Sequence, residues 1–248
     1  MPDFTPPSRP VPRPIAFLTD YGTRDGFAAV CHGVIATIAP AVRVVDVTHD
    51  VPPHDVRHGA AVLARVAAYL PPAVYLGVVD PGVGTARRAV AVVAGAGVLV
   101  GPDNGLLLPA AEVLGGVTAA YVLSEESWWL PRRDATFHGR DLFAPVAARI
   151  AAGSDPSGAG AAVEPASLAQ LPAPRTHVGS GTVTTEVTYV DRYGNVQLAV
   201  TDAQAVGRRA ARRRGRRRTR RPPPVRPRRR PRAGTTDVVH RPGGPGLR

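Results

Sequence analysis

The chain has 248 residues, a formal net charge of +12 and a single cysteine, Cys31. One cysteine excludes an intrachain disulfide framework and a cysteine-based zinc site. No apolar run approaches the ~20 residues that span a bilayer, and no charged start leads into an apolar signal segment. We therefore expect a globular protein of the cytoplasm that has no membrane partner.

The positive charge is concentrated at one end of the chain. Residues 1–207 contain 14 arginines against 18 acidic residues, whereas residues 208–248 contain 17 arginines against Asp237 alone. The C-terminal segment has no aromatic residue on which a base could stack, so we expect no specific nucleic-acid recognition. A basic arm that binds nucleic acid through its charge alone is one alternative.

The second alternative for this segment is a frameshift. The chain has no lysine and is rich in Ala, Gly, Pro and Arg, which is typical of GC-rich coding DNA. Because the composition changes abruptly inside a β-patterned region, we favour an out-of-frame end over an evolved arm. Either way, residues 208–248 cannot bury enough apolar surface to fold alone.

The first half of the chain alternates apolar runs with helical patterns. We expect strands at 15–19, 42–47 and 74–79, and helices at 25–38, 55–70 and 143–152, the first of them capped by Asp25. This order predicts an α/β domain with a mainly parallel sheet covered by helices. Functional groups are then expected at the carboxyl ends of the strands, where Asp20, Asp46, Asp50 and Asp80 stand.

Further strands and a linker complete the expected organisation. We predict a hairpin from 89–94 and 98–100, and a C-terminal β region from strands at 182–190 and 196–200. The expected domains are a disordered leader (1–14), an N-terminal α/β catalytic domain (15–153), a linker (154–180), the start of a β domain (181–207), and the arginine-rich tail (208–248).

The loop "VDPGVGTARR" after the third strand contains the first candidate site. Its two glycines lack the third glycine of a dinucleotide fingerprint and the lysine of a phosphate loop, and its leading carboxylate would repel a phosphate. Asp80 with Arg87 could be an acid oriented by a guanidinium. The alternative is an ordinary salt bridge within the loop.

Histidines supply two more candidates. His138 precedes Gly139 at an expected helix start, where an imidazole can exchange protons near neutral pH or simply cap or pack. His54 and His58 are four residues apart, so they could hold a metal with Asp55 as a base. Because His54 follows two prolines and no third ligand stands at a recognisable spacing, a solvated helix start is the preferred interpretation, with no metal.

Six ordered motifs between Ile15 and Val200 together resemble the S-adenosylmethionine hydroxide adenosyltransferases, the adenosine-forming S-adenosylmethionine hydrolases related to fluorinase and chlorinase. The motifs are "FLTDYGTRDGF", "VVDVTHDV", "GVVDPGVGTARR", "GPDNGLL", "TFHGRDLFAPVAARIAAG" and "VDRYGNV". The resemblance implies an N-terminal α/β domain, a C-terminal β-barrel and a homotrimer with the ligand between subunits. It also implies that water attacks C5′ of S-adenosylmethionine and expels methionine, without a cofactor.

The same resemblance implies roles for individual residues. Asp80 would accept the proton of the water, Arg87 would hold that acid ionised, and His138 would complete the relay. Substrate-binding positions fall on Asp20, at the ribose hydroxyls, on Gly139, and on two residues of the Asp-x-x-Gly-Asn turn near the methionine group. These two are Asp191 and Asn195.

Fluorinase provides a contrast within the resemblance, because it has tyrosine where Asp80 stands and tyrosine-serine at the positions of His138 and Gly139. A halide needs donors and no base, whereas water needs a base, so we expect hydrolysis. A halogenase-like enzyme, or an inactive domain with a basic nucleic-acid-binding tail, are the alternatives. The chain departs from the family pattern after Asn195, where the rest of the barrel is replaced by the arginine-rich tail, so this domain is expected to be truncated or frameshifted.

Overall fold

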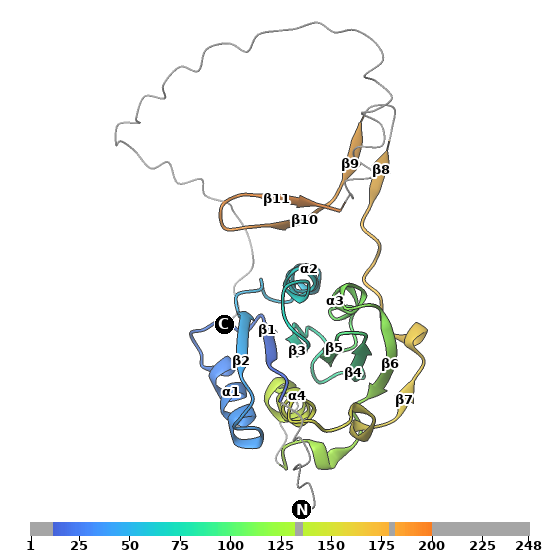
Figure 1. The fold of residues 1–248 in the computed structure, drawn as a ribbon. Helices are drawn as coiled ribbons and strands as arrows, with labels where there is room; N and C mark the ends of the chain where they lie inside the picture. The colour runs from blue at the N-terminus through green and yellow to red at the C-terminus, as the bar shows by residue number, and fades with distance from the viewer. Residues whose placement is uncertain (1–11, 132–135, 179–181, 200–248) are drawn as a thin grey trace, which may run out of the picture.

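A mixed seven-stranded sheet forms the centre of the computed structural model, which describes residues 12–131, 136–178 and 182–199 (Figure 1). The strand order is β2 (Val44–Thr48), β1 (Ile15–Thr19), β3 (Ala73–Val78), β5 (Gly97–Pro102), β4 (Ala89–Ala94), β6 (Val117–Val122) and β7 (Ala162–Val163). The first four strands run parallel, and the sheet continues from β5 with antiparallel pairs. The predicted α/β fold with a parallel core is confirmed.

Helices cover both faces of this sheet (Figure 1). The helices α1 (Phe27–Ile38) and α4 (Ala144–Ala151) pack on one face, and α2 (Val56–Ala67) and α3 (Leu108–Val113) pack on the other. Strand β1 shows why its sequence is apolar without interruption. Ile15 and Phe17 belong to the first core, whereas Ala16 and Leu18 belong to the second, since successive side chains of a strand point to opposite faces.

The start of α1 differs from the prediction. Asp25 does not cap the helix: the N-cap is Gly26, whose φ of 74° is left-handed, and no side chain caps it. Glycine adopts this conformation without steric cost, so the chain turns into the helix there. Helix α2 is capped as its sequence suggests, because the Asp55 carboxylate accepts from the His58 N–H at 2.9 Å.

The segment expected as a linker packs against the α/β region. It contains two 3₁₀ turns, η3 (Pro156–Ala159) and η4 (Pro165–Ser167), and the edge strand β7. Beyond η4, the Ala169 N–H donates to Asp103 at 2.8 Å. A two-residue strand and short turns leave no hydrophobic period, which explains why composition alone suggested a linker. Helix α3, strand β6 and the turn η1 (Glu126–Trp128) were likewise not anticipated.

Two separate strand pairs follow. These are β8 (Thr176–Val178) with β9 (Val183–Thr185), and β10 (Val187–Val190) with β11 (Val196–Leu198). Strand β11 agrees with the strand expected at 196–200, whereas the strand expected at 182–190 is divided into β9 and β10, and β8 lies in the segment expected as a linker. The second pair lies beside α2 (Figure 1), where the His58 and Tyr189 rings are 4.6 Å apart. The predicted leader lies almost entirely outside the described residues, and the tail entirely so. Of the helices in the described ranges, none is long and apolar enough to cross a membrane.

Candidate active site

Asp80, Arg87 and His138 form a contiguous trio. Asp80 follows the carboxyl end of β3, and its two carboxylate oxygens each accept from Arg87 Nε at 3.0 Å, with Nη2 of the same guanidinium also bonded to Oδ2. Arg87 Nη2 in turn lies 2.8 Å from His138 Nδ1. The Asp80 and Arg87 side chains are 6% and 11% exposed. The loop pair predicted from the sequence is therefore a buried ion pair joined to a distant histidine.

The loop after β3 is shaped by short internal hydrogen bonds. Thr85 Oγ1 donates to the Gly82 carbonyl at 2.7 Å and accepts from the Arg87 N–H at 3.3 Å. From outside the loop, Asn104 Nδ2 donates to the Val79 carbonyl at 2.9 Å. These bonds turn the chain back so that the Arg87 side chain returns to the acid seven residues before it.

His138 stands directly before the π-helical turn η2 (Gly139–Phe143), which leads into α4. A guanidinium can only donate, so Nδ1 must be the accepting nitrogen and the neutral ring carries its proton on Nε2. Burial, and then the Arg87 charge, lower the pKa of His138, while Asp80 and Asp141 oppose that shift. The imidazole is therefore the neutral, oriented member of the trio at physiological pH.

A cavity of about 290 Å³ opens beside the trio. It is lined by Asp20, Tyr21, Phe27, Pro53, His54, Asp80, Val83, Thr136, His138 and Gly139. Two of its aromatic rings, Tyr21 and Phe27, pack with each other and with Phe137, with centroid distances of 5.2 to 6.0 Å. One wall is thus aromatic and another presents the two carboxylates that end β1 and β3, as expected for a site at the carboxyl ends of parallel strands.

Asp20 is oriented by a residue whose role the sequence did not reveal. The His54 N–H donates to Asp20 Oδ2 at 2.9 Å, and His54 has a φ of 66°, the only left-handed value of a non-glycine residue in the described ranges. Such a conformation is uncommon outside glycine and concentrates at functional sites. His54 is exposed and stands directly before the N-cap of α2, as expected for a solvated helix start, and it also lines the cavity.

Gly139 lies against Tyr21. A Cβ at position 139 would be 2.1 Å from the Tyr21 hydroxyl oxygen, so no larger residue fits unless the ring moves. Burial raises the pKa of Tyr21, which keeps this hydroxyl protonated. The glycine after the histidine thus has a steric reason, which is the space that the tyrosine occupies at the cavity wall.

Asp191 and Asn195 lie elsewhere in the chain. They belong to the exposed turn between β10 and β11, where Asn195 Nδ2 donates to Asp191 Oδ2 at 2.6 Å and the Asn195 N–H donates to Oδ1 at 2.8 Å. These bonds lower the pKa of Asp191. Neither residue lines the cavity formed within this chain.

The possible metal pair His54 and His58 is divided between two environments. His54 lines the cavity, whereas the ring of His58 faces Tyr189. Phe27 and Tyr21 are cavity residues that the sequence analysis did not single out. Both stand in the "TDYGTRDGF" motif, and the aromatic residues of that motif were the available signal.

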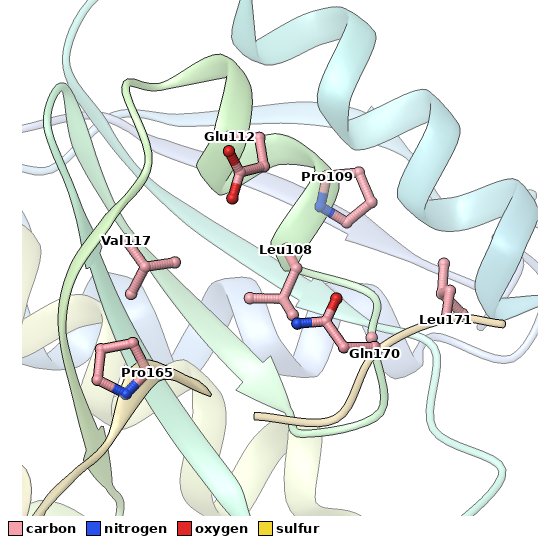
Figure 2. A pocket seen from close by; sticks show the side chains of 8 residues that line it. Leu108, Pro109, Glu112, Val117, Pro165, Gln170 and Leu171 are labelled. Atoms are coloured by element: carbon pink, nitrogen blue, oxygen red, sulfur yellow. The ribbon is translucent and has the colours of Figure 1, made fainter. Parts of the chain in front are cut away.

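A larger hollow of about 410 Å³ lies away from the trio, between α3 and the segment after β7. Figure 2 shows Leu108, Pro109 and Glu112 of α3 on one side, with Pro165 and Gln170 on the other. None of the predicted site residues lines it. Size therefore does not identify the site in this protein, and the smaller cavity has the convergent polar groups.

The fold and the cavity define an α/β protein with a cavity at the carboxyl ends of parallel strands, next to an acid, a guanidinium and an imidazole. Residues 15–160 match the family described as SAM hydroxide adenosyltransferase N-terminal domain. The chain belongs to this family, and the resemblance seen in the six motifs is confirmed.

Individual relatives agree with this assignment. An (R)-S-adenosyl-L-methionine hydrolase of Salinispora arenicola is 61% identical over 76% of this chain and 72% of its own length. The hydrolase of the same name from Thermus thermophilus is 45% identical over 74% and 72%. A fluorinase of Actinoplanes is more distant, at 29% identity over 78% and 74%.

Solved structures also resemble this fold. An uncharacterized conserved protein from Thermotoga maritima matches with a TM-score of 0.69 at 37% identity, covering 74% of this chain and 70% of its own. A conserved hypothetical protein from Thermus thermophilus matches with a TM-score of 0.61 at 39% identity, over 76% and 72%.

Proposed function

We propose that this protein hydrolyses (R)-S-adenosyl-L-methionine to adenosine and L-methionine. The observation that supports this most directly is the hydrogen-bonded, partly buried Asp80–Arg87–His138 trio at the edge of a cavity, in a chain of this family. In this proposal Asp80 activates the water, at the position where the resemblance implies a tyrosine in fluorinase. The relatives of highest identity quoted above are named hydrolases, whereas the fluorinase is more distant.

The reaction is an in-line displacement at C5′. The oxygen of water forms a bond to C5′ while the C5′–sulfur bond breaks, and the electron pair of that bond stays on sulfur as the thioether of methionine. The proton of the water passes to Asp80, whose carboxylate oxygens keep lone pairs beyond those that Arg87 engages. The substrate cation and water thus become adenosine, methionine and one proton.

The other members of the trio position the base. Arg87 fixes both oxygens of Asp80, and His138 fixes Arg87 by accepting at Nδ1. The Nε2–H of His138 is the group that can donate to the attacking oxygen and hold it in line. Since a neutral imidazole is required for this arrangement, the lowered pKa of His138 favours the active form.

The remaining cavity residues suit the substrate. Asp20 has the acceptor capacity to bind two vicinal ribose hydroxyls, and the His54 N–H holds its carboxylate in place. The aromatic wall of Tyr21 and Phe27 can face the sulfonium, because a cation is attracted to the face of an aromatic ring.

The sulfonium is already a good leaving group, so this step requires neither a cofactor nor a Lewis acid. Asp191 and Asn195 would meet the methionine group of a substrate bound to a neighbouring subunit of a homotrimer. The trimer, the cytoplasmic location and the roles of these two residues stay predictions.

Hydrolysis is tested by incubating the purified chain with (R)-S-adenosyl-L-methionine in H₂¹⁸O. We expect adenosine and methionine, with one ¹⁸O in the adenosine and none in the methionine, as measured by mass spectrometry. Label-free adenosine or an absence of product would contradict the proposal. Parallel reactions with fluoride or chloride distinguish the halogenase alternative, which would yield a 5′-halogenated nucleoside instead of labelled adenosine.

A further inference from the structure

A second cluster of polar side chains lies at the edge of the sheet, on residues that do not line the cavity. His32 projects from α1, Asp46 from β2, and His49 from the turn after β2. His32 Nε2 is 2.8 Å from Asp46 Oδ1, and His49 Nε2 is 3.1 Å from the same oxygen. The ligand atoms of these three residues all lie within 4.8 Å of one another. Among the described residues, no other group of three or more His, Cys, Asp or Glu side chains is this close.

The composition and size of this cluster are those of a metal site. Two imidazoles and one carboxylate provide three protein ligands, which is the number found where a tetrahedral zinc ion keeps one open position. Ligand atoms at ~2.0–2.1 Å from such an ion are roughly 3.3 Å apart, close to the two separations measured here. The third separation, between ligand nitrogens of the two imidazoles, is within 4.8 Å, so the rings have only to approach each other around an ion.

The surroundings of His49 provide a second observation. Its ring is only 7% exposed, and its other nitrogen, Nδ1, lies 2.9 Å from the hydroxyl oxygen of the buried Thr19. The Phe17 ring packs edge-on against both histidines, at 4.8 Å from His49 and 5.7 Å from His32. A partner on the second ring nitrogen is what orients a metal-binding histidine and selects its tautomer.

Access to the cluster comes from the solvent side. The His32 and Asp46 side chains are 35% and 49% exposed, in contrast to His49. The partly exposed His32 ring and Asp46 carboxylate therefore give an ion access to the cluster from the solvent. The half-open geometry also leaves room for a water as fourth ligand.

We propose that His32, Asp46 and His49 form a binding site for a late first-row divalent metal ion, zinc foremost. The ion would tie α1 to β2 and, through Thr19, to the end of β1, one residue before Asp20. This role is structural and is separate from the displacement at C5′, which uses the other cluster. The ligand set favours nitrogen-binding ions over Mg²⁺ and Ca²⁺, which prefer oxygen.

The experiment is a calorimetric titration of the chelator-treated full chain with Zn²⁺, repeated with Mg²⁺, and an absorption spectrum with Co²⁺ in place of zinc. We expect one Zn²⁺ per chain, no comparable uptake of Mg²⁺, and the visible d–d bands of Co²⁺ with mixed nitrogen and oxygen ligands. The readout is binding, so it does not depend on the proposed hydrolase activity.

Four variants assign the ion to this cluster. His32→Gln and Asp46→Asn change partly exposed side chains, and each should weaken Zn²⁺ binding by at least ~100-fold, since loss of an outer partner alone costs ~10–100-fold. Thr19→Val, which removes only the outer partner, should fall in that lower range. The exposed His177→Gln is the matched control and should bind like the parent chain.

Two results would overturn the proposal. Absence of stoichiometric Zn²⁺ binding by the folded parent chain would show that Asp46 simply accepts hydrogen bonds from two imidazoles. Unchanged affinity in both His32→Gln and Asp46→Asn, with circular dichroism like that of the parent, would place the ion elsewhere, for example at His54 and His58.

Discussion

The α/β region and the strand pairs that follow it differ most in what they bury. Every residue of β1 and of β3 is buried, whereas Val187, Val190, Val196 and Leu198 of β10 and β11 are 50% to 53% exposed. A strand covered on both faces holds its end in a fixed position. A two-stranded pair with open apolar residues is marginal on its own and is typical of a surface that awaits further packing.

The two regions also differ in the contacts that their polar residues make. Asp80, Arg87 and His138 converge on one cavity within the α/β region, whereas Asp191 and Asn195 bond to each other in an exposed turn. The predicted catalytic residues therefore lie together in the first region, and the two predicted methionine-binding residues lie in the second. The predictions below test whether function and stability divide along this line.

Removing the base should have the largest effect. Asp80→Asn keeps the shape of the side chain but cannot take the proton of water, so we expect kcat to fall by about 10²–10⁴-fold with KM little changed. The measurement is adenosine formation under substrate saturation. Activity within a factor of a few of the parent would show that another group activates the water.

Arg87 and its neighbour Arg88 form a matched comparison. Arg88 pairs with Asp103 and also donates to Ser167, away from the cavity. Arg87→Gln should lower kcat by about 100-fold or more, as loss of an oriented charged donor does.

Arg88→Gln is the control and should leave kcat within about threefold, because its loss affects a partly exposed pair. Similar losses in both variants would mean that the loop, and not the trio, was disturbed.

The pH dependence should report His138. Its lowered pKa predicts that kcat/KM stays level down to about pH 6.5 and falls by about tenfold per pH unit only below the folded-state pKa, where the ring becomes charged beside Arg87. This fall of kcat/KM at low pH should be absent from the residual activity of His138→Gln. A fall that persists in the variant would belong to another group.

The same shift affects stability. The unfolded chain accepts a proton on His138 as the pH falls through 6.5, the ordinary pKa of a histidine, while the folded state resists it. Stability therefore declines from that pH and levels off below the lowered folded pKa. Denaturant unfolding of His138→Gln should show a smaller decline over this range than the parent.

The contact between Gly139 and Tyr21 gives an intermediate effect. Gly139→Ala should cost about 1–3 kcal/mol of unfolding free energy, because the new methyl group overlaps the Tyr21 hydroxyl. Adding Tyr21→Phe removes the atom in closest conflict, so the double variant should recover part of the loss. A double variant no more stable than Gly139→Ala would show that the ring itself, and not its hydroxyl, limits the space.

The smallest effect is expected where the β10–β11 pair contacts α2. Arg65 donates to Gln197 at 2.6 Å and lies over the Tyr189 ring. Gln197→Ala should change the free energy of unfolding by less than about 1 kcal/mol, as for other exposed polar contacts. A much larger loss would mean that the strand pairs stabilise the α/β region more than their exposure suggests.

Local patterns were sufficient to predict much of the first region. The strands β1 and β3, which precede Asp20 and Asp80, could be predicted from the sequence, because a strand buried on both faces must be apolar at every position. Asp80 and Arg87 are seven residues apart, so their pairing could be suspected from one loop, and the family resemblance added His138. The family and the α/β fold are confirmed, while the catalytic roles stay predictions.

Other features depend on contacts that no local pattern encodes. The left-handed backbone of His54 exists because the surrounding fold holds it. A histidine before a helix start has no sequence pattern that predicts this conformation. His32 and Asp46 come from a helix and a strand whose packing had to be known before the cluster could be seen. Strand β7 was missed because two residues are too few to show a period.

Arg87 donates to both Asp80 and His138, and this sharing has a consequence for the proton that each turnover releases. A proton placed on His138 would set two cations side by side, at an atomic separation that is now 2.8 Å. The lowered pKa of the imidazole disfavours storing the proton there, and in the proposed mechanism Asp80 loses it before the next water binds. Delivery of one proton to the solvent is then an obligatory part of the cycle, and unbuffered solution should acidify in proportion to the adenosine formed.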